Sequence, residues 1–321
     1  MQSKLAMMWA GFVTVGLSVA SAGWAQNQAY PVKPIRFVTT IPGSGSDVIA
    51  RLLMPILTES LGQPIVVDNR GSVGAEAVAK AKPDGYTLLC YGPTVWISPL
   101  INTRVDYSIE RDFIPVTTAA FSPNLIVVHP SLPVKSVKDL IALAKARPGQ
   151  MNYAAGSVGS GAHLTAELFK SLARVNIVHI SYKGTAPGMV ALLSGEVAMS
   201  FPNAGTVAPY LKSGQLRALA VTTLRRSELT PGLPTAAESG LPGFESSTPF
   251  GYFAPAGTSP EIVGRLHKEV LQALKAPGIK QRLFGLGMEI VADTPQQFAA
   301  MIKADVAKWS KLIKEIGIAV N

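Results

Sequence analysis

The chain has 321 residues, a formal net charge of +9 and 48% hydrophobic residues, so it can bury a large core and is not expected to be disordered. Its lysines and arginines are scattered and aromatic residues make up only 7%, which argues against a nucleic-acid partner. The single cysteine, Cys90, excludes an internal disulfide and a zinc site built from thiolates, and the four histidines lack the spacing of metal ligands.

The N-terminus has the order of a secretory signal. Lys4 supplies a positive charge, an apolar run extends from Leu5 to Ala22, and Gly23-Trp24-Ala25 offers small residues to a signal peptidase. A membrane-spanning helix is the alternative, because the run approaches the ~20 apolar residues that such a helix needs. No cluster of lysine or arginine follows, so we expect residues 1–25 to be a signal peptide that is cleaved after Ala25.

Short apolar segments alternate with helical patterns along the next part of the chain. We expect strands at Ile35–Thr40, Ile65–Asp68 and Thr87–Tyr91, with helices at Asp47–Leu61 and Gly74–Lys80 between them. This βαβ rhythm predicts a parallel-type sheet covered by helices. Cys90 falls within an apolar strand, so a buried, unreactive thiol is expected there.

A second set of α/β units follows, and the length agrees with two domains. We expect strands at Leu125–His129, Asn152–Ala155, Ile177–Ile180, Val197–Phe201 and Leu216–Val221, and helices that begin after Ser136 and near Ala162, Ala186 and Thr206. Residues 225–249 are rich in proline, glycine and serine, and precede a strand at Gly251–Ala254 and helices at Pro260–Lys275 and Pro295–Ile316. The expected lobes are residues 26–126 with 249–321, and residues 127–248.

Each half of the chain contains a strand, a loop of glycine and serine, and a helix. The two loops are Pro42-Gly43-Ser44-Gly45-Ser46-Asp47 and Gly156-Ser157-Val158-Gly159-Ser160-Gly161. A helix N-terminus has unpaired N–H groups and a partial positive charge, so such a loop can bind a carboxylate or phosphate without a charged side chain. Glycine is also the usual residue of tight turns, and one loop alone would be ambiguous. Two loops, one in each lobe, predict a binding cleft.

Two side chains at these loops have two interpretations each. His163 could donate a hydrogen bond to an anion or could pack against its loop. Asp47 could contact a ligand, but a role as helix cap is favoured.

Other chemistries fit less well. Val48 stands where a dinucleotide fingerprint needs its last glycine, and no nucleotide P-loop is present, so no cofactor is expected. Gly156-Ser157-Val158-Gly159 resembles a nucleophile elbow, which leaves a secreted serine hydrolase that uses Ser157 as the alternative function.

Ordered motifs from Tyr30 to the C-terminus are similar to those of the TctC or Bug receptors, the substrate-binding proteins of tripartite tricarboxylate transporters. The motifs include Pro42-Gly43-x-Gly45-Ser46-Asp47, Lys82-Pro83-Asp84-Gly85-Tyr86-Thr87, Gly159-Ser160-Gly161-x-His163-Leu164, Tyr182-Lys183-Gly184 and Ala254-Pro255-Ala256-Gly257-Thr258. The resemblance implies an α/β, two-lobed fold like that of periplasmic binding proteins, with hinged lobes around a central ligand cleft.

The same resemblance implies a periplasmic, monomeric receptor, not an enzyme, that binds a small carboxylate-containing anion. Its expected partners are the membrane subunits of a transporter, or it acts alone as a sensor. By matching position, the ligand-binding residues are Pro42, Gly43, Ser44, Gly45, Ser46 and Asp47 in one lobe and Ser157, Val158, Gly159, Ser160, His163, Lys183, Gly184 and Thr185 in the other, with Gly92, Pro93 and Thr94 as weaker candidates. The short loop Gly71-Ser72-Val73-Gly74 and the pair Phe201-Pro202 depart from the family pattern, so the ligand stays open.

Overall fold

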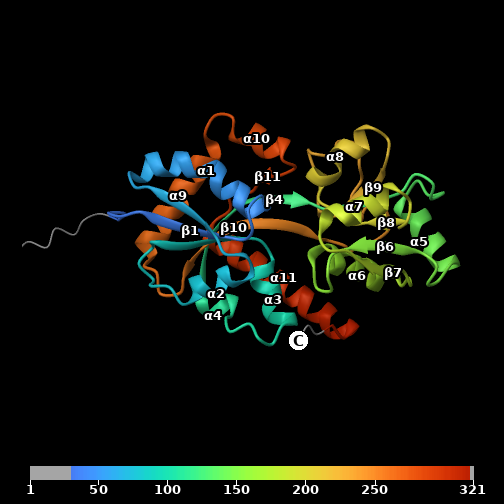
Figure 1. The fold of residues 1–321 in the computed structure, drawn as a ribbon, viewed down its shortest axis with the longest axis horizontal. Helices are drawn as coiled ribbons and strands as arrows, with labels where there is room; N and C mark the ends of the chain where they lie inside the picture. The colour runs from blue at the N-terminus through green and yellow to red at the C-terminus, as the bar shows by residue number, and fades with distance from the viewer. Residues whose placement is uncertain (1–29, 319–321) are drawn as a thin grey trace, which may run out of the picture.

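The structure, a computed structural model, describes residues 30–318. The expected signal peptide therefore lies outside the described residues. Over this range the chain forms two α/β lobes that lie side by side along the longest axis of the molecule (Figure 1). The two-lobed α/β fold expected from the sequence is confirmed.

The first part of the chain, to residue 123, builds most of one lobe. Its elements are β1 (Ile35–Thr39), α1 (Gly45–Leu61), β2 (Ile65–Asn69), the 3-10 turn η1 (Gly71–Val73), α2 (Gly74–Ala79), β3 (Thr87–Tyr91), α3 (Thr94–Ile101), α4 (Ile109–Asp112) and β4 (Phe113–Pro123). The predicted strands and helices up to Tyr91 are all present, with ends within two residues of their expected places.

The middle of the chain builds the other lobe. Its elements are β5 (Leu125–Val128), α5 (Val137–Ala146), β6 (Asn152–Ala155), α6 (Gly161–Ala173), β7 (Val178–Ser181), α7 (Thr185–Leu193), β8 (Met199–Ser200), α8 (Ala204–Lys212) and β9 (Arg217–Val221). Ser136 caps α5 as predicted, because its side chain accepts a hydrogen bond from the Asp139 backbone.

The last part of the chain returns to the first lobe. Its elements are β10 (Ser247–Pro255), α9 (Pro260–Lys275), α10 (Ile279–Gly285), β11 (Glu289–Ile290) and α11 (Pro295–Ile316). The bounds predicted for α9 and α11 are confirmed. Local chemistry sets the start of α11, where Thr294 and Gln297 form a reciprocal capping box and Pro295 occupies the first turn.

Within residues 30–318 the sheets have six and five strands, in the orders β11-β4-β10-β3-β1-β2 and β7-β6-β8-β5-β9. Both are mixed, so the expectation of a parallel-type sheet holds only in part. β1 pairs in parallel with β2 and β3, whereas β10 is antiparallel to β3 and β4. The reason is that the chain leaves the first sheet along β4 and comes back along β10, so these neighbours run in opposite directions (Figure 1).

The sequence predicted no element between Tyr91 and Leu125, and this segment holds α3 and the long strand β4. Eight of the eleven residues of β4 are buried, including both threonines, so the strand lacks the alternation of apolar and polar residues that identifies a half-buried strand. Pro115 and Pro123 lie near its two ends, and because proline within a run of residues argues against a strand, they weaken the sequence signal for β4 further.

Apolar side chains cover both faces of the first sheet. α1 and α9 pack on one face, around Phe37 and Tyr252. α3 and α11 pack on the other, where Trp96, Phe253 and Phe298 lie in one aromatic cluster. That second core continues into the other lobe, so the lobes share a packed contact beside the strands that join them.

We predict that Gly251, in the middle of β10, cannot be replaced by alanine without loss of stability. A Cβ atom there would overlap the Phe298 ring and lie 2.9 Å from the Thr117 carbonyl oxygen. Gly251→Ala should lower the free energy of unfolding by about 1–3 kcal/mol. Gly264→Ala is the matched control, because a Cβ in that α9 position meets no atom within 4 Å, and it should raise stability by about 0.5–1 kcal/mol. Urea denaturation followed by circular dichroism compares the two; equal effects would contradict the packing argument.

Candidate functional site

A cavity of about 470 Å³ lies between the two lobes. The first lobe contributes α3 and Trp309 of α11, and the second contributes the loops before α6, α7 and α8. Residues at both strand connections, Asn124 and Ser246 to Thr248, form its floor. None of the described residues that line it carries a charged side chain. Its apolar wall consists of Ile97, Ile101, Leu164, Met189, Phe201 and Trp309.

Four helices of the described range begin at this cavity. The residues before their first turns are Pro93 for α3, Ser160 for α6, Gly184 for α7 and Asn203 for α8, and all four line the cavity. The first N–H groups of a helix lack partners within it, and the helix dipole adds a partial positive charge. The backbone therefore gives the cavity a positive potential that no side chain supplies, which suits an anion.

A polar network holds the cavity floor at the place where the chain passes between the lobes. The Asn203 amide donates to Asn124 Oδ1 at 2.7 Å and to Thr248 Oγ1 at 3.2 Å. Asn124, which is 5% exposed, donates in turn to Ser246 Oγ at 3.4 Å. These bonds connect the second lobe with both crossing segments.

The loop from Gly156 to Ser160 is supported from below by two histidines. The backbone N–H of Gly159 donates to His163 Nδ1 at 3.3 Å, and His179 Nε2 donates to the Gly156 carbonyl oxygen at 3.1 Å. The two imidazole rings lie 4.5 Å apart, and His163 is only 5% exposed. Each end of the loop is thus fixed by a ring nitrogen.

Burial holds His163 in its neutral form. Burial is the main cause that lowers its pKa to about 4, with a further contribution from His179. Burial also lowers the pKa of His179. Glu167 favours the charged form of His163, but its carboxylate already accepts bonds from Lys170 Nζ at 2.7 Å and from Tyr153 at 2.8 Å. At neutral pH both imidazoles are therefore uncharged.

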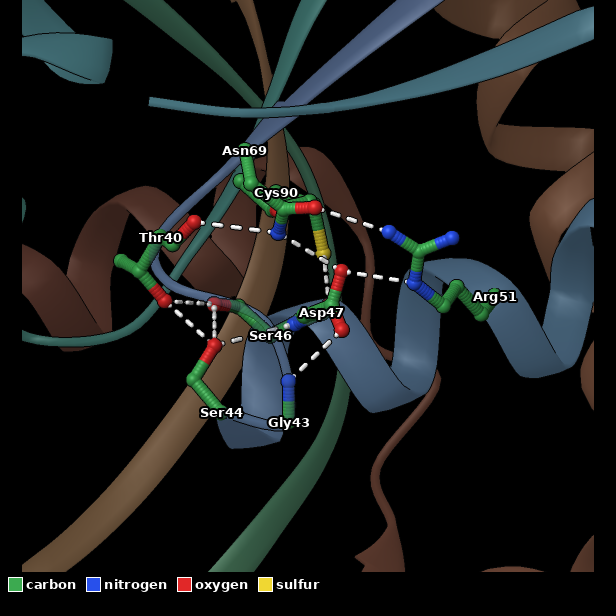
Figure 2. Close-up of polar contacts among 9 residues, drawn as sticks. Thr40, Gly43, Ser44, Ser46, Asp47, Arg51, Asn69 and Cys90 are labelled. Carbon is green, nitrogen blue, oxygen red and sulfur yellow. Dashed lines mark hydrogen bonds and ion pairs between the residues drawn. The ribbon is translucent and has the colours of Figure 1, made fainter. Parts of the chain in front are cut away.

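The other glycine loop, from Pro42 to Ser46, is fixed by Asp47 (Figure 2). The Asp47 carboxylate accepts hydrogen bonds from the Gly43 N–H at 2.9 Å, from Asn69 at 2.8 Å and from Arg51 at 2.9 Å. Burial alone would raise the pKa of this carboxyl group, but the three hydrogen bonds and the Arg51 charge outweigh burial and lower it. The N-cap of α1 is Ser44 and not Asp47, which lies in the first turn of the helix and accepts from the Gly43 N–H that precedes it.

Cys90 lies directly behind this loop. Its Sγ donates to the Ser46 carbonyl oxygen at 3.4 Å, and burial raises the pKa of the thiol to about 12. The prediction that Cys90 is buried is confirmed.

The cavity brings together some of the residues predicted from the sequence and not others. Ser157, Gly159, Ser160, Gly184 and Thr185 line it, as do the weaker candidates Pro93 and Thr94. Residues 42–47 do not, because Phe250 packs between the first loop and the cavity wall, against both Gly45 and Gly92. Val158 and Lys183 are exposed outside it, and His163 is buried behind its loop. Ligand contact at every one of these positions stays a prediction.

Several cavity residues were missed from the sequence. Ile97 and Ile101 of α3, Asn124, Asn203 and Trp309 carry no local motif, and each reaches the cavity only because distant elements pack together. The one available signal was the segment Gly92-Pro93-Thr94, which follows a strand as the two glycine loops do.

Neither a metal site nor a membrane helix is found in residues 30–318. No three histidine, cysteine, aspartate or glutamate side chains in that range are placed to hold a metal ion. No helix there combines the length and the apolar character needed to cross a bilayer.

Two α/β lobes, joined by paired strands and enclosing an anion-compatible cavity, define the class of two-lobed solute receptors. Residues 49–318 match the family described as "Tripartite tricarboxylate transporter family receptor", and the chain belongs to that family. BugT of Bordetella pertussis is 37% identical over 94% of this chain and 96% of its own length. The resemblance stated from the sequence is confirmed.

Solved structures agree with this assignment. The structure of R. palustris Rpa4515 with adipate has 38% identity and a TM-score of 0.76, and covers 90% of this chain and 99% of that one. MatC from Rhodopseudomonas palustris with bound malate has 28% identity and a TM-score of 0.73, and covers 88% and 100%.

We predict that Asp47 stabilises the first loop in a pH-dependent way. Asp47→Asn places an amide N–H₂ among three donors, and at pH 7 should lower the free energy of unfolding by about 1–3 kcal/mol. Because folding lowers the pKa of this group, its stabilisation is full above the ordinary value of 3.8 and is lost as pH falls through the lower folded value. The difference between variant and wild type should therefore shrink at acidic pH.

Denaturation at pH 7 and pH 3 measures this difference. Asp139→Asn is the matched control, because Asp139 also accepts a backbone bond near a helix start but is exposed, and it should cause a smaller loss. A pH-independent effect of Asp47→Asn would refute the assignment.

Proposed function

We propose that the chain is a periplasmic receptor that binds a small carboxylate-containing organic anion in the cavity between its lobes. It delivers the anion to the membrane subunits of a tripartite tricarboxylate-type transporter or acts as a sensor. The observation that carries the proposal is the cavity itself, where four helix N-termini meet without a charged side chain. The relatives solved with adipate and malate support a carboxylate as ligand.

The lining favours an anion with an apolar body. The carboxylate would accept hydrogen bonds from Ser160, Thr185 and the first-turn N–H groups, and the rest of the ligand would pack on Ile97, Ile101 and Trp309. A volume of about 470 Å³ is within the ~300–1,000 Å³ of ordinary small-molecule sites.

The ligand would be enclosed by hinge bending between residues 26–126 with 249–321 and residues 127–248. The chain leaves the first sheet at the end of β4, at Pro123, and rejoins it at the start of the neighbouring strand β10, at Ser247. Two short segments therefore connect the lobes. Residues 42–47 would then form the outer edge of the closing cleft, with Val158, His163 and Lys183 around the opposite loop. The receptor would work as a monomer.

Catalysis is not part of the proposed function. Among the described residues, no histidine is hydrogen-bonded to Ser157 Oγ, and the imidazoles of His163 and His179 bind the backbone of its loop. We predict no esterase turnover above that of Ser157→Ala on p-nitrophenyl acetate. Turnover that Ser157→Ala abolishes would instead favour the secreted hydrolase.

We predict that carboxylic acids, and not their methyl esters or amides, stabilise the protein. Stabilisation should grow with ligand concentration as RT ln(1 + [L]/Kd). The ester should fail because it removes the charged acceptor that the helix N-termini require. Thermal shift over adipate, malate, benzoate and their esters measures this, and equal shifts by acids and esters would overturn the proposal.

Substitutions at two glycines test whether the acid binds in the cavity. Gly159 has φ +84°, and a Cβ there would collide with Ile101 of the other lobe, so Gly159→Ala should weaken binding of the best acid at least tenfold. Gly264→Ala, in α9 and away from the cavity, adds a Cβ that meets no atom within 4 Å and should leave the affinity nearly unchanged.

A further inference from the structure

The two glycine loops have the same construction. In each, a glycine with positive φ, Gly43 at +77° or Gly159 at +84°, donates its N–H to the side chain four residues later. In each, a serine caps the helix by accepting from the backbone N–H of that same later residue. The later residue is Asp47 in one loop and His163 in the other.

The acceptors differ in charge and in position relative to the cavity. Asp47 is anionic, is balanced by Arg51, and its loop does not line the cavity. His163 supports a loop whose residues Ser157, Gly159 and Ser160 do line it. An imidazole can accept a hydrogen bond through Nδ1 without a negative charge, whereas a carboxylate cannot.

We propose that His163 is a positioning and specificity-determining residue: its neutral imidazole fixes the loop from Gly156 to Ser160 as Asp47 fixes the other loop, and it keeps negative charge away from the cavity. The specificity half of this inference rests on the proposed function, since it supposes that the cavity holds an anion. The positioning half rests on the hydrogen bonds alone.

The geometry fixes the tautomer of His163. Because Nδ1 accepts the Gly159 N–H, the ring proton must be on Nε2, which faces Glu167 Oε1 at 3.8 Å. Protonation of Nδ1 would set two N–H groups against each other and release Gly159. His179 complements this arrangement, because its Nε2–H binds the Gly156 carbonyl and its ring packs on Tyr153 at 5.2 Å.

The groups around His163 keep this arrangement neutral overall. His179 from β7, Glu167 and Lys170 from α6 and Tyr153 from β6 face it. The Glu167 charge is balanced by Lys170. An aspartate at position 163 would add one unbalanced negative charge behind the cavity loop.

Ligand-free NMR of the full chain tests the positioning half. At pH 7.5, long-range ¹H–¹⁵N spectra should show His163 with a bare Nδ1 and a protonated Nε2, and His163→Leu should shift the Gly159 amide strongly. His163→Gln, which keeps a neutral acceptor, should restore the shift at least in part. His129→Gln, at a half-buried histidine of the same lobe whose ring bonds to Ser131, should leave it unchanged. A protonated Nδ1 at pH 7.5, or a Gly159 amide that ignores His163→Leu, would overturn the inference.

The pH profile adds a readout that a packing role would not move. His163 has a folded pKa of about 4, below its ordinary 6.5, so the stability it contributes is full above 6.5 and is lost as pH falls towards 4. The Gly159 amide of the folded protein should move in wild type only as pH approaches 4, where folded His163 takes up a proton, and should stay still there in His163→Gln. Identical profiles in both proteins would contradict the inference.

A negative charge added at position 163 tests the specificity half, with adipate, malate and benzoate as probes. His163→Asp should keep the wild-type fold, because a carboxylate can still accept from Gly159, yet weaken the best probe by about tenfold or more through repulsion. His163→Gln should bind within a few-fold of wild type. Equal affinities of His163→Asp and His163→Gln would overturn this half. If no probe stabilises even the wild type, the proposed function and this half fail together, while the ligand-free spectra still decide positioning.

Discussion

The antiparallel pairing of β4 with β10 is the constraint on which the rest of the structure depends. Phe113 lies opposite Pro255 at one end of the pairing, and Pro123 lies opposite Ser247 at the other. Both chain connections between the lobes leave from the Pro123 end. Backbone hydrogen bonds along this ladder hold the two connections side by side, which is the arrangement that the proposed hinge bending requires. Gly251 allows Phe298 to pack directly on the ladder, which attaches α11 to the same strands.

Charged side chains are separated from the cavity. The chain has a net charge of +9, yet the described residues around the cavity are uncharged and its potential comes from helix N-termini. Charged groups lie instead at the edge of the hinge, where Lys308 of α11 binds Asp305 and also Glu245, just before β10. Asp305 in turn accepts from Trp96 of α3, at 2.7 Å. One ionic network therefore connects the crossing segment, α11 and the helix that forms the apolar cavity wall.

The glycine loops show how one local design serves two environments. Serine cap, positive-φ glycine and a side-chain acceptor four residues later recur in both. The carboxylate version is paired with Arg51 and Asn69 away from the cavity, and the imidazole version stands behind the cavity loop. The choice of acceptor thus follows the charge that each environment tolerates.

The sequence by itself determined the elements whose ends are set by neighbouring residues. α9 and α11 have a serine or threonine cap followed by proline, and their bounds could be read directly; the two glycine loops were found for the same reason. Only the tertiary structure decided that β4 is the central connecting strand, because its burial on both faces depends on elements more than 100 residues away, such as β10 and α11. It also decided that Ser160 and Thr185 meet Ile97 and Trp309 in one cavity while residues 42–47 lie behind Phe250. A sequence pattern encodes hydrogen bonds within a turn of the chain, whereas which loop faces a shared cavity is set by packing between segments far apart in the sequence.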